Sequence, residues 1–398
     1  MKKSELLNGY LQSVKDKKVL DLLATEKKVH LSGLSGSAAS IVASCCFNES
    51  ENASIFILKD KEAAAYFFND LEQFITEKDL LFYPGSYRRP YQIEETDNAN
   101  VLMRAEVLNR LSSRRKASCI VTYPDALFEK VITKKELTRN TLKLTIGEEI
   151  GIDFLNETLF EYGFEYAEIV VEPGQFSIRG GIVDVFSFSN EHPYRIEFFG
   201  DEVESIRSFN INTQLSILEV KKLNIIPNIE NKDMIESRVP FMNYLGNEAT
   251  LWVDDQGLCE GQLDKLYLKS YDAFENLDGE IKHLKPEELF INSKVFRKAI
   301  KDFNLVSFGL NTKKGLLNID FNTSFQPSFN KQFDLIIEHF NTQTSEGYKT
   351  LILCSSQKQE ERFHSIFEKT EGDFKFNTML LPLHEGFIDH ENKLLCYT

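Results

Sequence analysis

The sequence lacks the residue spacings by which most metal sites and nucleophilic active sites are recognised. Its six cysteines include no C-x-x-C pair, and its seven histidines form no H-E-x-x-H motif. No Ser/His/Asp or Cys/His set stands out along the chain. We therefore predict no metal site and no catalytic residue. The cysteines lie in or beside apolar runs, which predicts buried free thiols in a reducing cytoplasm.

Long apolar runs and basic charge are also scarce. No run reaches the ~18 apolar residues of a membrane span, and the N-terminus MKKSELLNGYLQS lacks the apolar core of a signal peptide. Acidic residues outnumber basic ones by 61 to 46, which gives a formal net charge of −15. Because affinity for nucleic acid comes mainly from neutralised phosphates, this balance argues against broad nucleic-acid binding. We expect a cytoplasmic protein of roughly two to four domains.

One segment matches a phosphate-binding loop in part of its motif. Residues 28–47 have the pattern of a strand, the small-residue loop SGLSGSAAS and a helix, which is the setting of a P-loop. Gly33 falls at the first glycine and Ser40 at the magnesium-binding hydroxyl, but Ala38 and Ala39 replace the last glycine and the lysine. Without the lysine the main charge on a nucleotide is lost. We interpret this segment as a tight strand-to-helix turn that is not expected to bind nucleotide, and we predict no cofactor.

The segment TLWVDD at 250–255 has the shape of a Walker B strand, in which Asp254 and Asp255 would hold Mg²⁺. Many buried strands also end in acidic residues at a loop. Without a lysine at position 39 the two carboxylates have little to act upon, so we interpret the pair as a degenerate Walker B site.

A turn-rich loop, PGSYRRPY, carries Arg88 and Arg89 between tyrosines. Arginine interleaved with aromatic residues can stack on nucleic-acid bases. A plain surface loop explains the same residues, and both interpretations stay open.

The densest strand pattern of the chain lies at 176–210. Apolar and polar residues alternate over 182–186, 194–199 and 203–209, which predicts three strands of a β-meander with turns at paired small residues. Three arginines, Arg179, Arg195 and Arg207, lie among the apolar strand residues. They are either solvated side chains on the outer face or part of a partner-docking face, since arginine and aromatic residues are enriched at interface hot spots.

Alternation of strands and helices predicts a parallel sheet covered by helices, interrupted by a segment of different character. Residues 4–26 are predicted to form one amphipathic helix. The polar stretch 311–330 is the best linker candidate, and the chain ends inside an apolar run, so we expect a truncated last domain. The predicted division is a first half of an α/β domain at 1–140, an inserted α+β domain at 141–229, the second part of the first domain at 230–310, a linker at 311–330 and a small α/β domain at 331–398.

The motifs RGGIVDVF and YRIEFFGDEVESIRSF, at 179–186 and 194–209, resemble the second domain of UvrB and of the bacterial transcription-repair coupling factor (Mfd). The order of the P-loop-like turn, the FYPG loop, the inserted domain and the VDD strand agrees with that resemblance. It covers essentially the whole chain as the N-terminal module of the coupling factor. It implies a degenerate P-loop NTPase-like parallel-sheet domain, an inserted UvrA-binding α+β domain and a further small α/β domain.

The same resemblance implies which residues bind UvrA. Position by position, the role falls on Arg179 of RGG and on Arg195 and Phe199 of YRIEFF, with Arg207 as a weaker member. The chain would be a monomeric, non-catalytic module that recruits UvrA for transcription-coupled nucleotide excision repair. Stalled RNA polymerase and DNA would be contacted by other parts of the parent protein, which resembles an ATP-dependent DNA translocase.

Two departures from UvrB favour the coupling factor. UvrB has an intact phosphate loop and binds ATP, whereas this chain has Ala39 in place of the lysine. UvrB also carries a long tyrosine-rich hairpin that clamps DNA, and only a short loop follows the FYPG motif here. The alternative function is a UvrB-like ATP-dependent helicase or damage-recognition subunit. Whether the UvrA-binding face is masked in the parent protein stays open.

Overall fold

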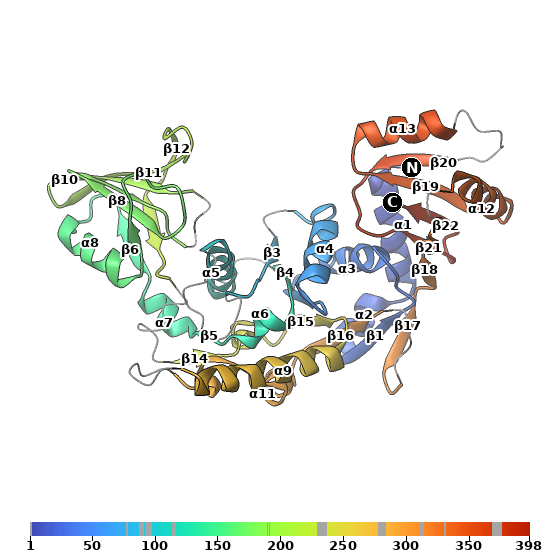
Figure 1. Cartoon of the computed structure of the whole chain (residues 1–398), viewed down its shortest axis with the longest axis horizontal. Helices are drawn as coiled ribbons and strands as arrows, with labels where there is room; N and C mark the ends of the chain where they lie inside the picture. The colour runs from blue at the N-terminus through green and yellow to red at the C-terminus, as the bar shows by residue number, and fades with distance from the viewer. Residues whose placement is uncertain are drawn as a thin grey trace.

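The structure is a computed structural model that describes residues 2–76, 79–86, 91, 98–113, 117–188, 190, 192–228, 237–277, 284–309, 312, 314–329, 332–367 and 376–398. Three sheet-containing units follow one another across the molecule (Figure 1). None of the helices in these ranges is both long and apolar enough to cross a membrane.

A seven-stranded sheet forms the centre of the molecule, and every one of its ladders is parallel. Its inner strands are short apolar runs such as SIFI and CIVT that are buried along their whole length, as expected for a sheet covered on both faces. Across the sheet the strands are β17 (Leu317–Asp320), β1 (Lys28–Ser32), β16 (Asn304–Phe308), β15 (Thr250–Val253), β2 (Ser54–Ile57), β4 (Cys119–Thr122) and β3 (Leu80–Phe82).

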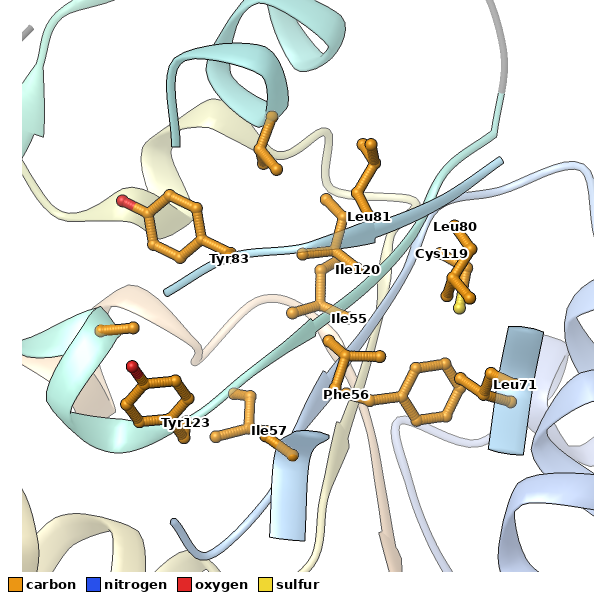
Figure 2. Packing of buried hydrophobic residues seen from close by; sticks show 14 of the residues in the cluster. Ile55, Phe56, Ile57, Leu71, Leu80, Leu81, Tyr83, Cys119, Ile120 and Tyr123 are labelled. Atoms are coloured by element: carbon orange, nitrogen blue, oxygen red, sulfur yellow. The ribbon is translucent and has the colours of Figure 1, made fainter. Parts of the chain in front are cut away.

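Helices cover both faces of this sheet (Figure 1). Helices α3 (Ala38–Asn48) and α4 (Lys61–Glu72) lie on one side, and α9 (Gln256–Glu275) with α11 (Ser293–Ala299) lies on the other. Figure 2 shows the side chains of β2, β3 and β4 packed together, with Phe56 directed toward Leu71 of α4. The Phe56 ring also stacks on Trp252 of β15, with 5.1 Å between centroids. Further described helices of this unit are α5 (Asn98–Ser113), α6 (Pro124–Phe128), η2 (Phe241–Tyr244) and α10 (Pro286–Leu289).

The N-terminal segment forms two helices, so the prediction of one helix over 4–26 is wrong. Helix α1 (Lys3–Asp16) ends before Lys18, which has a φ of 50°, and α2 (Val19–Thr25) follows. A residue in the left-handed region interrupts the helical hydrogen bonds and turns the chain.

The inserted unit is joined to the central sheet by a neck of paired strands. Strand β5 (Val131–Ile132) pairs with β14 (Arg238–Val239), and after α7 (Lys134–Arg139), β6 (Leu142–Thr145) pairs with β13 (Lys222–Ile225). Beyond the neck lie α8 (Ile152–Glu161) and a six-stranded sheet that contains the predicted meander. In order across that sheet the strands are β12 (Ser216–Glu219), β11 (Glu202–Phe209), β10 (Tyr194–Phe199), β9 (Ile182–Val185), β8 (Gln175–Arg179) and β7 (Glu165–Tyr166).

The C-terminal unit is a five-stranded mixed sheet with α12 (Phe333–Ser345) and α13 (Gln357–Phe367). The segment 311–330, predicted as a linker from its polar composition, contributes β17 to the central sheet and β18 to this one, so only residues 321 and 322 lie between the two strands. Across the sheet the strands are β18 (Thr323–Phe325), β21 (Phe387–Asp389), β22 (Leu394–Tyr397), β19 (Lys349–Cys354) and β20 (Phe376–Leu380).

Candidate protein-docking site

One side of the six-stranded sheet carries charged residues beside a small apolar cluster of Val170, Phe186 and Phe209. Side chains that face each other across neighbouring strands point to the same side of a sheet. The register pairs Asp184 with Arg195 and Arg195 with Arg207, while Ile196 and Val183 form the buried side. We call the charged side the arginine face and define it by six residues: Arg179, Asp184, Arg195, Glu197, Phe199 and Arg207.

The arginines of this face are held by two acidic side chains. Asp184, only 1% exposed, accepts hydrogen bonds from Arg195 Nε at 2.7 Å and Nη2 at 2.8 Å. The same carboxylate also accepts a hydrogen bond from Arg179 Nη2. Glu197 accepts one from Arg207 Nη2. Two guanidinium groups therefore share one buried carboxylate, and the third has a partner on the neighbouring strand.

Arg195 is the most enclosed of the three arginines. Its guanidinium lies over the Phe209 ring at 4.8 Å from the centroid, a favourable arrangement of a cation on an aromatic face. The hydrogen bonds that Arg195 donates to Asp184 raise the pKa of Arg195, while partial burial opposes that shift. Arg195 therefore stays charged, and its planar group is ordered before any partner arrives.

Arg179 and Phe199 lie together at one end of the face. The Phe198 amide donates to the Gly181 carbonyl at 2.8 Å, which brings the start of β9 beside the end of β10. A Cβ at residue 181 would lie 3.0 Å from the Phe198 carbonyl oxygen, so glycine permits this close approach. The Arg179 side chain is 45% exposed and Phe199 is 79% exposed.

The sequence-based prediction of the site omitted Asp184 and Glu197. Both are acidic residues within alternating strands, and both pair with arginines about ten positions away. Their position in a strand was a visible signal, but only the register assigns each to its arginine. With these partners in place, the arginines have a role in the fold of the sheet as well as being available at the surface.

The P-loop-like turn lies at the edge of the central sheet where the parallel strands end. Gly33 has a φ of +66°, and Ser40 is fully buried. The Ser40 hydroxyl shares its one proton between the Ser37 carbonyl at 2.8 Å and Asp70 Oδ2 at 2.9 Å. Ala38 is fully buried in the first turn of α3, and Ala39 lines a pocket of about 360 Å³ beside the turn.

The two acidic residues after β15 have different environments. Asp254 lines the same pocket as Ala39. Asp255 is the N-cap of α9, because its Oδ1 accepts a hydrogen bond from the Leu258 amide at 3.0 Å. The helix therefore accounts for the second acidic residue without a metal ion. In the described part of the chain no three His, Cys, Asp or Glu residues are grouped so that they could hold a metal ion.

The FYPG loop is tied into the core of the central unit. Gly85 donates its amide to Tyr123 Oη at 3.0 Å, and Arg104 donates to the Pro84 carbonyl at 2.9 Å. Arg88 and Arg89 lie outside the described residues, so both interpretations of this loop, base stacking and a plain surface loop, stay open.

Comparison with known proteins places this region in a repair context. A family model described as the UvrB interaction domain matches residues 142–230, from β6 to beyond β13. The transcription-repair-coupling factor of Bacillus subtilis (strain 168) is 34% identical over 202 residues, which is 50% of this chain and 17% of that protein. About half of the chain is homologous to transcription-repair-coupling factors.

Coupling factors of other bacteria agree with that homology. Those of Myxococcus xanthus and Escherichia coli (strain K12) are 29% and 25% identical over 215 and 208 residues, each 52% of this chain and 18% of the relative. The matched part of the chain thus spans less than a fifth of the length of these curated coupling factors. The arginine face lies within the stretch that matches the UvrB interaction domain.

Proposed function

We propose that this chain is a non-catalytic recruiting module that docks UvrA through the arginine face and thereby links stalled RNA polymerase to nucleotide excision repair. Homology to coupling factors supports the role in transcription-coupled repair. The match to the UvrB interaction domain supports a contact with a repair protein. The module acts as a monomer in the cytoplasm, while RNA polymerase and DNA are bound by other parts of the parent protein.

The observation that carries this proposal is that Arg179 and Phe199 lie at the same end of the sheet, where β8 ends beside the start of β9 and β9 begins beside the end of β10. One is a partly exposed arginine anchored on a buried carboxylate, and the other is an exposed aromatic ring at the same end of the sheet. Arginine and aromatic side chains contribute most of the energy in many interfaces. A side chain that is already ordered loses less entropy on binding, so this end of the face suits a specific contact.

The alternative function, a UvrB-like ATP-dependent helicase, is supported less well. The strand, loop and helix of an NTPase-like unit are present, and Asp254 shares a pocket with the loop. Position 39 nevertheless carries no positive charge. The loop amides of Leu34, Ser35 and Ser37 donate to protein oxygens, where a phosphate loop would offer its amides to the ligand. We infer that the unit is a degenerate NTPase-like domain without a nucleotide cofactor.

The proposal is tested by titrating purified UvrA with the full chain and with Phe199→Ala. Because this side chain is 79% exposed, its removal should change the free energy of unfolding by less than about 0.5 kcal/mol. Loss of a hot-spot ring should still weaken UvrA binding by about tenfold or more. Arg179→Glu should have a similar effect on affinity, and the pair Arg179→Glu/Arg195→Glu should abolish binding.

A matched control is Arg297→Glu, which reverses an exposed arginine on α11, outside the arginine face. It should bind UvrA as the unmodified chain does. Because the description of the matched family model names UvrB, the same variants are also titrated with UvrB. If the chain binds UvrB but not UvrA, and Phe199→Ala weakens that binding, the arginine face is still the docking site but its partner is UvrB. Unaltered UvrA binding by the Phe199 and Arg179 variants would refute the assignment.

A further inference from the structure

The P-loop-like turn is in direct contact with the C-terminal unit. The Ser37 amide donates to the Glu385 carbonyl at 3.0 Å, and the Glu385 amide donates to Ser37 Oγ at 3.1 Å. On its other side, the Ser35 amide donates to Thr323 Oγ1 at 2.9 Å, and that hydroxyl donates to the Gly33 carbonyl at 2.7 Å. These loop groups are thus bonded to strand β18 of the C-terminal sheet and to the segment that precedes its strand β21.

Glycine at position 36 allows a protein backbone to approach the turn closely. Gly36 has a φ of +51°, and a Cβ there would lie 2.8 Å from the Gly386 carbonyl oxygen and 3.0 Å from that of Glu385. Nucleotide-binding loops use glycine so that a ligand reaches the backbone amides. In this chain the group that makes the close approach is the backbone of residues 385 and 386.

The hydroxyl at the magnesium-binding position, that of Ser40, is hydrogen-bonded within the protein. Ser40 Oγ donates to Asp70 Oδ2 at 2.9 Å, and Asp70 Oδ1 accepts the His384 amide at 2.7 Å. The His384 ring stacks on Tyr66, with 3.5 Å between centroids. One buried carboxylate therefore connects the start of α3 to the C-terminal unit.

The space left beside the turn is unsuited to a polyphosphate. Among the residues that the structure describes, the pocket of about 360 Å³ is lined by a single lysine, Lys59, and by several carboxylates. Repulsion between these carboxylates and phosphate would oppose nucleotide binding even with a lysine at position 39. The acidic residues of the lining are Asp60, Glu62, Asp70, Asp254 and Glu385.

We propose that the turn 33–40 is an intramolecular latch that binds the backbone of residues 384–386 at the place where a nucleotide-binding fold binds phosphate. The latch fixes the C-terminal unit on the central sheet and excludes nucleotide even when the missing lysine is restored. This inference concerns the former nucleotide site and does not depend on which protein docks on the arginine face.

The latch is tested by hydrogen exchange of the full chain, with mass spectrometry of a peptide covering 382–388. Gly36→Ala should speed exchange in this peptide by about tenfold or more, since the added methyl group meets two backbone carbonyls. Exchange in a peptide covering 394–398 should not change, because the C-terminal sheet stays folded. The matched control is Gly200→Ala, which has a similar φ of +64° with no atom within 4 Å of the added Cβ.

A milder variant covers the case in which Gly36→Ala does not fold. Ser37→Ala removes only the hydroxyl, which accepts the Glu385 amide and also hydrogen-bonds to the Asp70 carboxylate. Loss of one such hydrogen bond should speed exchange in the 382–388 peptide by about three- to tenfold. Unchanged exchange of this peptide in every folded variant would overturn the latch.

Exclusion of nucleotide is tested with Ala38→Gly/Ala39→Lys, which restores the complete G-x-x-x-x-G-K-S pattern. Titration with a fluorescent ATP analogue and Mg²⁺ should show no saturation up to about millimolar concentration, the weak end of the affinity range. Protection of the 382–388 peptide verifies that this variant is folded. Saturable binding in the micromolar range would overturn the exclusion.

Discussion

Asp184→Asn is the substitution that tests most directly how the arginine face is held. The carboxylate is 1% exposed and accepts hydrogen bonds from Arg195 at 2.7 and 2.8 Å, in addition to one from Arg179. Asparagine has nearly the same size, but it is uncharged and has a single acceptor oxygen. Hydrogen bonds to charged groups contribute about 1.5–3 kcal/mol. Because Arg195 keeps some contact with water, we expect a loss of about 2 kcal/mol in the free energy of unfolding.

Two probes are needed to assign that loss to the inserted sheet. The single tryptophan, Trp252, lies in β15 of the central sheet, so its fluorescence reports that sheet. Urea unfolding followed by far-ultraviolet circular dichroism should show an earlier transition for Asp184→Asn, while the Trp252 transition stays in place. UvrA binding should weaken about tenfold, because two arginines must then be ordered on binding at about 0.5–1.5 kcal/mol each.

Arg179→Ala is the comparison that separates stability from binding. Its side chain is 45% exposed, so its ion pair should contribute less than about 1 kcal/mol to stability. Its effect on UvrA affinity should nevertheless match that of Asp184→Asn. If Asp184→Asn changes the free energy of unfolding by less than about 0.5 kcal/mol, the shared carboxylate does not organise the arginine face. If it destabilises the sheet without affecting affinity, the network serves the fold alone.

Two further predictions concern the other units. Glu129→Gln removes the negative charge that lies 3.1 Å from the fully buried Arg104 and should cost about 3–5 kcal/mol. The loss should appear as an earlier Trp252 transition in urea, and a shift below about 1 kcal/mol would contradict the prediction. Burial lowers the pKa of His339 from its ordinary 6.5. Below that pH the unfolded chain takes up a proton that the folded domain resists, so stability should fall as the pH drops through 6.5. His339→Gln should remove this part of the pH profile of thermal unfolding, and an unchanged profile would assign the loss to other groups.

Much of the central fold is predictable because strands buried on both faces are continuous apolar runs in the sequence. Apolar runs such as SIFI and TLWV are long enough to be identified as inner strands of a parallel sheet. Strands β17 and β18 were missed because they are short, polar and partly exposed, so their composition is typical of a loop. The break at Lys18 was missed as well, since a left-handed lysine has no sequence signal comparable to that of glycine.

Part of the candidate site is likewise predictable from the sequence, and part is not. Arginines among apolar strand residues are visible in the sequence, and they indicate a candidate docking face within 176–210. Their partners are not visible, because Asp184 reaches Arg195 only through the register of β9 and β10. Likewise, the sequence shows that position 39 lacks a lysine, but only the three-dimensional contacts show that Glu385 bonds to Ser37 of the turn.

The arrangement of the three units separates the two proposed contacts. The arginine face lies beyond a neck of two short ladders, β5 with β14 and β6 with β13, whereas the latch lies at the opposite side of the central sheet (Figure 1). Among the described residues, the hydrogen bonds and ion pairs of the two networks share no residue. We therefore expect Gly36→Ala to bind UvrA within about twofold of the unmodified chain, far below an allosteric coupling of about 1–3 kcal/mol.

Coupling between two binding events is reciprocal, so the converse experiment must agree. Saturating UvrA should leave exchange of the 382–388 peptide unchanged, and Phe199→Ala should do the same without UvrA. The opposite result is that UvrA binding changes the exchange of this peptide and that Gly36→Ala changes the UvrA affinity by the same free energy. That result would mean that the neck couples the inserted unit to the C-terminal unit. In that case the former nucleotide site would still regulate the docking face, with a segment of the chain's own backbone in place of the nucleotide.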